Sequence, residues 1–329
     1  MQTQKSPSTE RVAISDGWLA MGTFFEVDLR VHPDDEALAR TWIGWARSEI
    51  SRLEELYSRH DPVSALSALN RSLAREEVLR AGARIDAELE SMLFAAIEVW
   101  EATGGAFDIT VGPLVEVWRE AVESGRWPSV ETLRMAKRRV GAEGLLMMGG
   151  GELQVAKRGM RLDLDGMSKG AVLDRLRERF EKALPGAAAL FSFGESSILA
   201  LGDPGETEGG GWRLMVRPDP ASSRKPVVLR LRDRALSASS SIGQVSQIAG
   251  EQISHVIDPR TGSAIAETVE AIVVAERATI ADAWSTALLV VGANRSAIRL
   301  LDRTGLEAKI SDSAGRAIAT ENWEGMVAR

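Results

Sequence analysis

A histidine heads the segment formed by residues 254–262, which reads SHVIDPRTG. Histidine is scarce in this chain, which has three of them and no cysteine. The apolar pair after His255 fits the end of a strand, and DPRTG fits a turn in which proline fixes φ and glycine takes a positive φ. A strand and a turn explain the aspartate, the proline and the glycine, but they give no reason for His255 or Arg260.

A carboxylate and a hydroxyl lie four positions apart in residues 279–289, which read TIADAWSTALL. At this spacing Asp282 and Thr286 share a helix face, roughly opposite the apolar one. Two neighbouring oxygens suit a hard cation such as Mg²⁺. Alternatively, Thr279 is an N-cap, Asp282 is the acidic residue of a capping box, and Thr286 is simply exposed. On this segment alone, the frequency of helix caps favours the capping box.

Two carboxylates, a glycine and a lysine occur together in residues 163–170, which read DLDGMSKG. The pattern predicts a strand that ends at the carboxylates and a helix that opens at Ser168. A helix N-terminus offers free N–H groups and the positive end of the helix dipole, which suit a phosphate, and Lys169 adds a positive charge. Ser168 would equally serve as a plain N-cap. The segment is not a Walker loop, because the order GxxxxGK[ST] is absent.

Two further loops have both a structural and a binding interpretation. In residues 105–113, which read GAFDITVGP, Phe107 is either a core residue or part of a surface behind a flat ligand. Asp108 is either a turn former or an acceptor for the polar edge of that ligand. In residues 58–62, which read SRHDP, His60 is either an exposed loop residue or a ligand contact.

The elements that must position these segments follow no regular βαβ order. Apolar residues at helical spacing predict amphipathic helices, and short apolar runs between turn residues predict strands. The predicted helices cover residues 35–57, 85–103, 129–140, 168–182, 280–291 and 295–303. The predicted strands include residues 20–30, a hairpin of 152–156 with 161–165, and a last hairpin that turns near residue 314. Strand-rich segments broken by long helices indicate an α+β fold.

Composition limits the other possibilities. The chain has 329 residues, of which 44% are hydrophobic, so it can bury a large core. A net charge of −7 without blocks of like charge argues against nucleic acid as a partner. The absence of cysteine excludes disulfides, thiolate zinc sites and a cysteine nucleophile.

The ends of the chain and its hydropathy give expectations for organisation and location. We expect a flexible N-terminal arm at residues 1–16 and a single domain at residues 17–329. No apolar run approaches the length that spans a bilayer. Since no signal peptide or lipid-anchor cysteine is visible, we expect a cytoplasmic protein, or a periplasmic one from which a leader was removed.

Taken in order along the chain, these segments resemble the FAD:protein FMN transferases, also known as the ApbE family. Met21, Gly22 and Thr23 resemble the family's MGT, and residues 255–262 resemble its HIIDPRTG. Each motif is weak by itself, whereas six in the family's order are strong evidence of kinship. The other matching segments are residues 58–70, 106–114, 163–170 and 281–288.

The resemblance implies an α+β fold of ApbE type, with T-fold-like mixed sheets, long helices and an FAD cleft between two subdomains. It implies an enzyme that binds FAD and Mg²⁺, cleaves the pyrophosphate and releases AMP. The FMN would be attached through a phosphoester to a threonine or serine of an acceptor protein, such as a redox protein.

The resemblance also assigns roles to individual residues. Mg²⁺ would be held by Asp282, Thr286 and a main-chain oxygen of Ser168, and His255 would be the catalytic base. The residues that would contact FAD are Met21, His60, Ala106, Phe107, Asp108, Lys169 and Val256. A base is needed because a threonine hydroxyl is a poor nucleophile near neutral pH, and histidine has a suitable pKa. Arg260 is expected to pin its turn through Asp258.

Several positions depart from the family's pattern. Asp165 stands where a small residue is common, Ala171 where an aromatic one follows the Lys-Gly pair, and His60 where Phe or Tyr often stacks on adenine. Glu195, Ser196 and Ser197 replace part of a Gly-Gly-Asp strand break, and Ser239, Ser240 and Ser241 replace Ser-Gly-Asp. Because acceptor handling depends on these loops, two alternatives remain: an FAD pyrophosphatase, or a flavin-binding protein without turnover.

Overall fold

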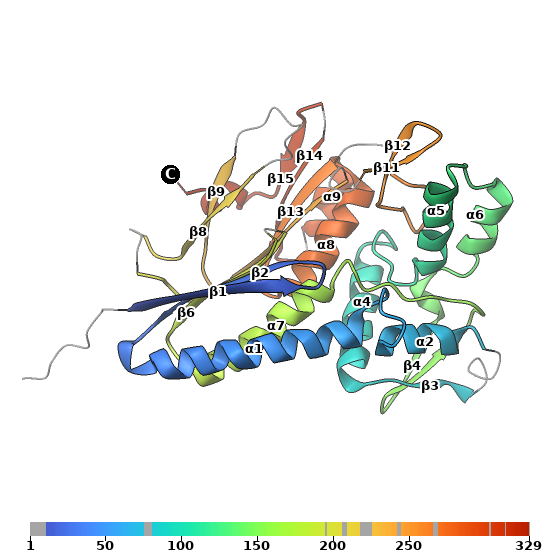
Figure 1. Ribbon diagram of the computed structural model, residues 1–329. Coiled ribbons are helices and arrows are strands. Elements are labelled where there is room, and N and C mark those ends of the chain that lie inside the picture. The colour runs from blue at the N-terminus through green and yellow to red at the C-terminus, as the bar shows by residue number, and fades with distance from the viewer. Residues whose placement is uncertain are drawn as a thin grey trace, which may run out of the picture.

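In the computed structural model, eight antiparallel strands form one large sheet in the order β1-β2-β6-β7-β10-β13-β14-β15 (Figure 1). The structure describes residues 11–75, 81–194, 196–205, 209–217, 226–241, 245–265, 269–302, 304–312 and 314–328. The strands are β1 (Val12–Ala20), β2 (Thr23–Val31), β6 (Ala188–Phe193), β7 (Ser197–Leu201), β10 (Arg234–Ser240), β13 (Val269–Ala275), β14 (Glu307–Asp312) and β15 (Ala317–Ala319). Successive side chains of each strand point to opposite faces, so the sheet separates two layers.

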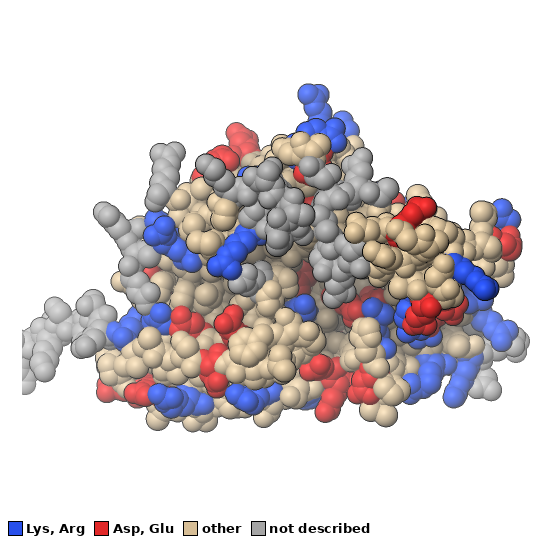
Figure 2. All heavy atoms as spheres, turned by 45° about the horizontal axis from the view of Figure 1, so that its top comes forward, with Lys and Arg blue, Asp and Glu red and all other residues tan. Residues whose placement is uncertain are grey.

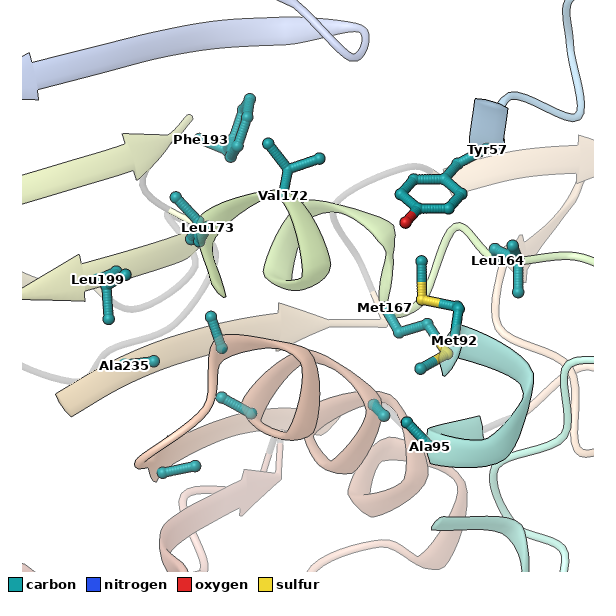
Figure 3. Close-up of a cluster of buried hydrophobic side chains, with 14 of the residues drawn as sticks. Tyr57, Met92, Ala95, Leu164, Met167, Val172, Leu173, Phe193, Leu199 and Ala235 are labelled. Carbon is teal, nitrogen blue, oxygen red and sulfur yellow. The ribbon is translucent and has the colours of Figure 1, made fainter. Parts of the chain in front are cut away.

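Three helices cover one face of this sheet: α1 (Glu36–Tyr57), α7 (Ser168–Ala183) and α8 (Ala278–Val291) (Figure 1). Their apolar sides and this face of the sheet form the main core. The rings of Trp42 in α1 and Phe191 in β6 stack with their centroids 5.2 Å apart. Figure 3 shows Val172 and Leu173, at the start of α7, in the buried cluster with Phe193.

The opposite face is covered by a hairpin of β8 (Trp212–Val216) and β9 (Val227–Leu231) together with the short helix α10 (Trp323–Met326). Leu229, Leu236 and Trp323 are almost fully buried in this second cluster. The alternation along β10 places Leu236 in this cluster and Ala235 in the main core, as the two-residue period of a strand requires.

The remaining elements form a helical region beside the end of the sheet that holds the β1–β2 turn (Figure 1). The described elements there are α2 (Ala65–Leu73), β3 (Ala83–Arg84), α4 (Ala87–Ala102), α5 (Gly112–Ser124), α6 (Val130–Lys137), β4 (Leu145–Gly149), β5 (Glu152–Val155), β11 (Val245–Ile248) and β12 (Glu251–Ser254). Two 3-10 turns (Pro33–Asp35 and Ala142–Gly144) and α9 (Arg295–Leu301) complete the described elements. Leu66, Leu93 and Leu164 of this region join the main core, which packs the region against the sheet.

The surface carries both signs of charge. Figure 2 shows acidic and basic side chains interspersed over one face, which is hollowed near its middle. Among the described residues, no helix is both long and apolar enough to cross a bilayer.

The predicted α+β class and the predicted helices are confirmed, and the last hairpin forms as β14 and β15. The prediction of a strand over residues 20–30 needs a correction. Residues 12–16, expected in a loose arm, belong to β1, and Met21 and Gly22 form the turn to β2 with φ of 50° and 72°. Trp18 stabilises this additional strand, β1, because its ring centroid lies 4.8 Å from that of Phe25 in β2.

The predicted hairpin of residues 152–156 with 161–165 is wrong. β5 pairs instead with β4, to which a turn at Gly150 and Gly151 joins it, and with β3 on its other side. The buried side chain of Asn70 hydrogen-bonds with the backbone of the 161–165 segment. It accepts from the N–H of Leu162 at 2.7 Å and donates to the carbonyl of Leu162 at 2.9 Å. The segment also meets the chain before α5, where the N–H of Asp163 donates to the carbonyl of Ile109 at 2.7 Å. Asn70 and this short parallel bridge therefore replace the hairpin partner that the sequence pattern suggested.

Candidate active site

Asp282 lies in the second turn of α8 with only 6% of its surface exposed. Its Oδ2 accepts a hydrogen bond from the main-chain N–H of Gly170 at 2.7 Å, and its Oδ1 accepts one from the Ser197 hydroxyl at 2.9 Å. The carboxylate therefore joins the N-terminus of α7, the start of β7 and α8. Burial raises the pKa of Asp282 to about 6, against the opposing effects of Ser197, the Gly170 N–H and Lys169.

The capping-box interpretation of Asp282 is wrong, because another carboxylate caps α8. Asp174 of α7 accepts hydrogen bonds from the N–H groups of Ala278 and Thr279, at 2.7 and 3.1 Å, and from the Thr279 hydroxyl at 2.6 Å. With its helix end already satisfied, Asp282 is available for another role.

The segment 163–170 opens α7, but Ser168 is not its side-chain cap. Met167 holds the N-cap position without a capping side chain, and Ser168 is the first helical residue and is buried. Gly170 lets α7 approach α8 closely, because a Cβ atom at this position would lie 2.2 Å from the carbonyl oxygen of Ala278. The partly buried Lys169 and the positive end of the α7 dipole thus lie together, which suits a phosphate, whereas Asp174 occupies the N–H groups at the start of α8.

Thr286, Phe107 and Gly166 bring three of the predicted segments into contact. A Cβ atom at Gly166 would lie 3.1 Å from the Phe107 ring and 3.3 Å from the Thr286 hydroxyl oxygen. That hydroxyl donates to the main-chain oxygen of Asp282 at a long 3.3 Å. The carboxylate, the threonine hydroxyl and the loop before α7 consequently border one small region.

The side chain of Asp108 acts as a turn former. Its Oδ1 accepts from the N–H and the hydroxyl of Thr110 at 2.8 and 2.6 Å, and its Oδ2 accepts from the N–H of Ala142 at 3.2 Å. Burial raises the pKa of Asp108, while these hydrogen bonds oppose the rise. Ala106 and Phe107 are also buried. The contact of these three residues with a flavin stays a prediction.

The loop at residues 58–62 is joined to the loop before α7 by an ion-pair cluster. Arg59 Nε lies 2.6 Å from Asp165 Oδ2 and 3.1 Å from Asp163 Oδ2, and His60 Nε2 lies 3.5 Å from Asp165 Oδ2. Burial and the charge of Asp165 raise the pKa of Asp163 to about 6, against the effect of Arg59. Asp165, a departure from the family's pattern, thus has a structural partner.

A pocket of about 130 Å³ lies behind this cluster, and sequence reasoning missed it. Its lining includes the charged side chains of Arg59, Arg119, Arg161 and Asp163 and the exposed His60. Arg161 is paired with Glu116 at 2.6 Å, so the lining is close to charge balance.

His255 follows β12 and is exposed, whereas Val256 is buried. The prediction for Arg260 is confirmed: its Nε and Nη2 atoms donate to Asp258 at 2.9 and 3.0 Å. The indole of Trp118 in α5 donates to the carbonyl of Gly262 at 2.9 Å and anchors the same turn. The DPRTG turn therefore holds in place the backbone that follows His255.

Met21 lies at the turn between β1 and β2, and the start of β2 that follows this turn contacts Gly194. The N–H of Gly194 donates to the carbonyl of Phe24 at 2.9 Å, and Ser197 is hydrogen-bonded to Asp282. Adjacent elements thereby carry six of the predicted site residues, namely Met21, Phe107, Ser168, Lys169, Asp282 and Thr286. His255 lies on a separate element, directly after the β11–β12 hairpin.

The described residues contain no group of three His, Cys, Asp or Glu side chains able to hold a metal ion. One carboxylate, one hydroxyl and a main-chain oxygen remain a suitable donor set for a hard cation. Oδ1 and Oδ2 of Asp282 accept hydrogen bonds from Ser197 and Gly170 respectively, and a carboxylate oxygen has a second lone pair beyond the one so used. The residues present therefore fit Mg²⁺.

Comparison with known proteins gives the class of this protein first. A protein of Escherichia coli (strain K12) named FAD:protein FMN transferase is 27% identical across 97% of this chain and 89% of its own length. One of Salmonella typhimurium with the same name is 30% identical across 80% of this chain and 75% of its own length. The crystal structure of the Pseudomonas stutzeri flavinyl transferase ApbE in its apo form shares the fold, with a TM-score of 0.80, 22% identity and coverage of 96% and 97% of the two chains. The crystal structure shows that the fold is shared, and the named relatives show that this chain is an enzyme of the transferase class.

The family follows from the sequence itself. The family model described as the ApbE family matches residues 21–310, and the chain belongs to this family.

Proposed function

We propose that this protein is a Mg²⁺-dependent FAD:protein FMN transferase that attaches FMN through a phosphoester to a threonine or serine of an acceptor protein and releases AMP. The observation that best supports this proposal is the meeting of Asp282, Thr286 and the loop before α7 beside two helix N-termini. The names of the relatives agree with it.

Asp282, Thr286 and the main-chain oxygen of Ser168 would hold the cation. When bound, Mg²⁺ offsets the negative charge of the pyrophosphate and stabilises the departing phosphate of AMP. The hydrogen bonds of Asp282 to Gly170 and Ser197 hold the carboxylate in one orientation before any ligand binds.

The protein groups around the cation would bind and orient the two substrates. Lys169 and the positive end of the α7 helix dipole bind the pyrophosphate. Met21, His60, Ala106, Phe107, Asp108 and Val256 are the proposed FAD contacts. His255 takes the proton from the acceptor hydroxyl as its oxygen bonds to the phosphorus of the FMN half, and the bond from that phosphorus to the bridging oxygen breaks as AMP leaves. The exposure of His255 suits an acceptor as large as a protein.

The test is incubation with FAD, Mg²⁺ and a purified acceptor domain that carries a threonine. A fluorescent flavin band at the acceptor's position on a denaturing gel, with AMP released in equal amount, is the expected result. Omission of Mg²⁺ and replacement of the acceptor threonine by alanine are the two controls, and both should abolish the band.

Other outcomes distinguish the remaining functions. AMP released without a band would mean that water takes the place of the acceptor, as in an FAD pyrophosphatase. Tight FAD binding with neither AMP nor a band, across several acceptor domains, would identify a flavin-binding protein without turnover.

A further inference from the structure

A network of serine hydroxyls lies between α8 and the sheet, directly behind Asp282. Ser197 of β7 donates to Asp282 Oδ1 at 2.9 Å, and Ser285 of α8 donates to the main-chain oxygen of Asp282, also at 2.9 Å. Ser237 and Ser239 of β10 lie 3.0 and 2.7 Å from the Ser285 hydroxyl oxygen. Two strands distant in sequence from α8, β7 and β10, thus contribute hydroxyls to the network around Asp282.

The hydroxyls of this network satisfy one another. Ser285 donates to the main-chain oxygen of Asp282, and its hydroxyl oxygen is also within hydrogen-bond distance of Ser237 and Ser239. Ser237 also hydrogen-bonds the Asp282 carboxylate. Ser285 is completely buried, and Ser197 and Ser237 are less than 5% exposed. A buried network in which each hydroxyl has a partner restricts its members to one arrangement.

These serines interrupt an otherwise apolar layer. Leu199 in β7 and Ala235 in β10 point to the same face as the serines and belong to the main core. A buried hydroxyl contributes less hydrophobic stabilisation than an aliphatic side chain, and a buried carboxylate is costly without donors. The buried serines are therefore best explained by the hydrogen bonds that the buried carboxylate of Asp282 requires.

The network also affects Thr286. Ser285 and Thr286 donate to the same main-chain oxygen of Asp282, at 2.9 and 3.3 Å. Since the Ser285 bond is the shorter one, the Thr286 hydroxyl can turn towards a cation while the oxygen of Asp282 stays satisfied. Ser197 therefore restricts the orientation of the Asp282 carboxylate, and Ser285 leaves the Thr286 hydroxyl free to bind a cation.

We propose that Ser197 and Ser285 are positioning residues that hold Asp282 and Thr286 in the geometry that binds the divalent cation. This inference rests on the proposed function, since it assumes that the two side chains are cation ligands. It assigns a role to Ser197, one of the residues of this chain that stand where the family has a Gly-Gly-Asp strand break.

The experiment measures the binding of Mn²⁺ alone, as the probe for Mg²⁺, by the loss of the free Mn²⁺ signal in electron paramagnetic resonance. Substitutions S197A and S285A should weaken Mn²⁺ binding about 10- to 100-fold, as loss of a group that orients a ligand usually does. The variant S197T, which keeps the hydroxyl, should restore most of the affinity. S311A is the matched control, because Ser311 is a buried serine of β14 in the same sheet but outside the network, and it should bind Mn²⁺ like the wild type.

A second readout separates positioning from simple loss of structure. In the transfer assay, S197A should raise the Mg²⁺ concentration that gives half-maximal rate, while the KM for FAD changes less than twofold. Wild-type affinity for Mn²⁺ in both S197A and S285A would overturn the positioning role and leave the proposed function intact. A wild-type protein that does not bind Mn²⁺ would instead overturn the cation site and this inference together.

Discussion

The main-chain N–H of Gly170 donates to Asp282 Oδ2 at 2.7 Å, so one buried carboxylate connects the N-termini of α7 and α8. This contact requires a close approach of the two helices, which the lack of a side chain at Gly170 permits. The first turn of α7, which carries Ser168 and Lys169, is held against Asp282 as a result.

Replacement of Gly170 by alanine should therefore lower both stability and activity. The new Cβ would lie 2.2 Å from the carbonyl oxygen of Ala278, so the helices must separate and the hydrogen bond to Asp282 lengthens. We expect a loss of about 1–3 kcal/mol in the free energy of unfolding, typical of overpacking, measured by urea denaturation. Gly44 is the matched control, because it is an exposed glycine in α1 where an added Cβ atom would meet nothing within 4 Å. G44A should be neutral or stabilise the protein by up to about 1 kcal/mol. Equal destabilisation by both variants would contradict the close-approach explanation.

Removal of the Asp282 carboxylate should abolish transfer without abolishing FAD binding. The variant D282N keeps the size of the side chain but lacks the charge that a cation needs. We expect the rate of flavin attachment to fall at least about 100-fold, the usual order for loss of one electrostatic contact to a reacting group. The Kd for FAD, measured by quenching of flavin fluorescence without Mg²⁺, should change much less. A D282N protein that transfers FMN at the wild-type rate would eliminate Asp282 as a cation ligand.

The sequence predicted the local features of this molecule well. The amphipathic spacing in residues 35–57 identified α1, and the pattern DPRTG identified a turn pinned by Arg260 and Asp258. Both depend on residues close together in the chain, whose geometry follows from helical period or turn chemistry.

The errors arose where distant residues decide the outcome. The capping box at Thr279 failed because Asp174, 104 residues earlier than Ala278, caps α8. The hairpin expected at residues 161–165 failed because Asn70, 92 residues away from Leu162, and the carbonyl of Ile109 satisfy its backbone. Spacing along the chain carries no information about such contacts. The sequence contained one indication of the serine network, since Ser237 and Ser239 are two residues apart and therefore share a strand face. Their partner Ser285 could not be identified without the fold.

Acid should destabilise the protein through Glu49, which anchors a cluster of ion pairs between α1, α7 and α4. The hydrogen-bonded Arg52 lowers the pKa of Glu49 to about 2, with help from Arg175 and against the effect of burial. Because the folded pKa lies below the ordinary value of 4.5, the stabilisation is fully present above about pH 4.5 and is lost as the pH falls towards 2. We expect a contribution of about 1–3 kcal/mol, reduced by the partial exposure of both arginines.

The measurement for Glu49 is urea denaturation of wild type and E49Q at several pH values. The difference in the free energy of unfolding between the two proteins should be constant above about pH 5 and should shrink between about pH 4.5 and 2. E178Q is a suitable control, since Glu178 pairs with Arg175 on the exposed surface and should change the curve little. A difference between wild type and E49Q that does not vary with pH would show that the ion pairs do not stabilise the fold.

Replacement of His255 should slow the chemical step and leave the fold unchanged. The side chain is exposed after β12, and the turn that follows is held by Asp258, Arg260 and Trp118. Loss of a general base usually costs about 100- to 10,000-fold in rate, so H255N should lower kcat for flavin attachment by that order, with the Kd for FAD and the melting temperature close to wild type. H32N is the control, because His32 is an exposed histidine before the short helical turn at Pro33–Asp35, on the far side of α1 from its Tyr57 end. Its kcat should match the wild type. An H255N variant with unchanged kcat, measured under single-turnover conditions so that product release cannot mask the chemical step, would require another residue to accept the proton of the acceptor hydroxyl.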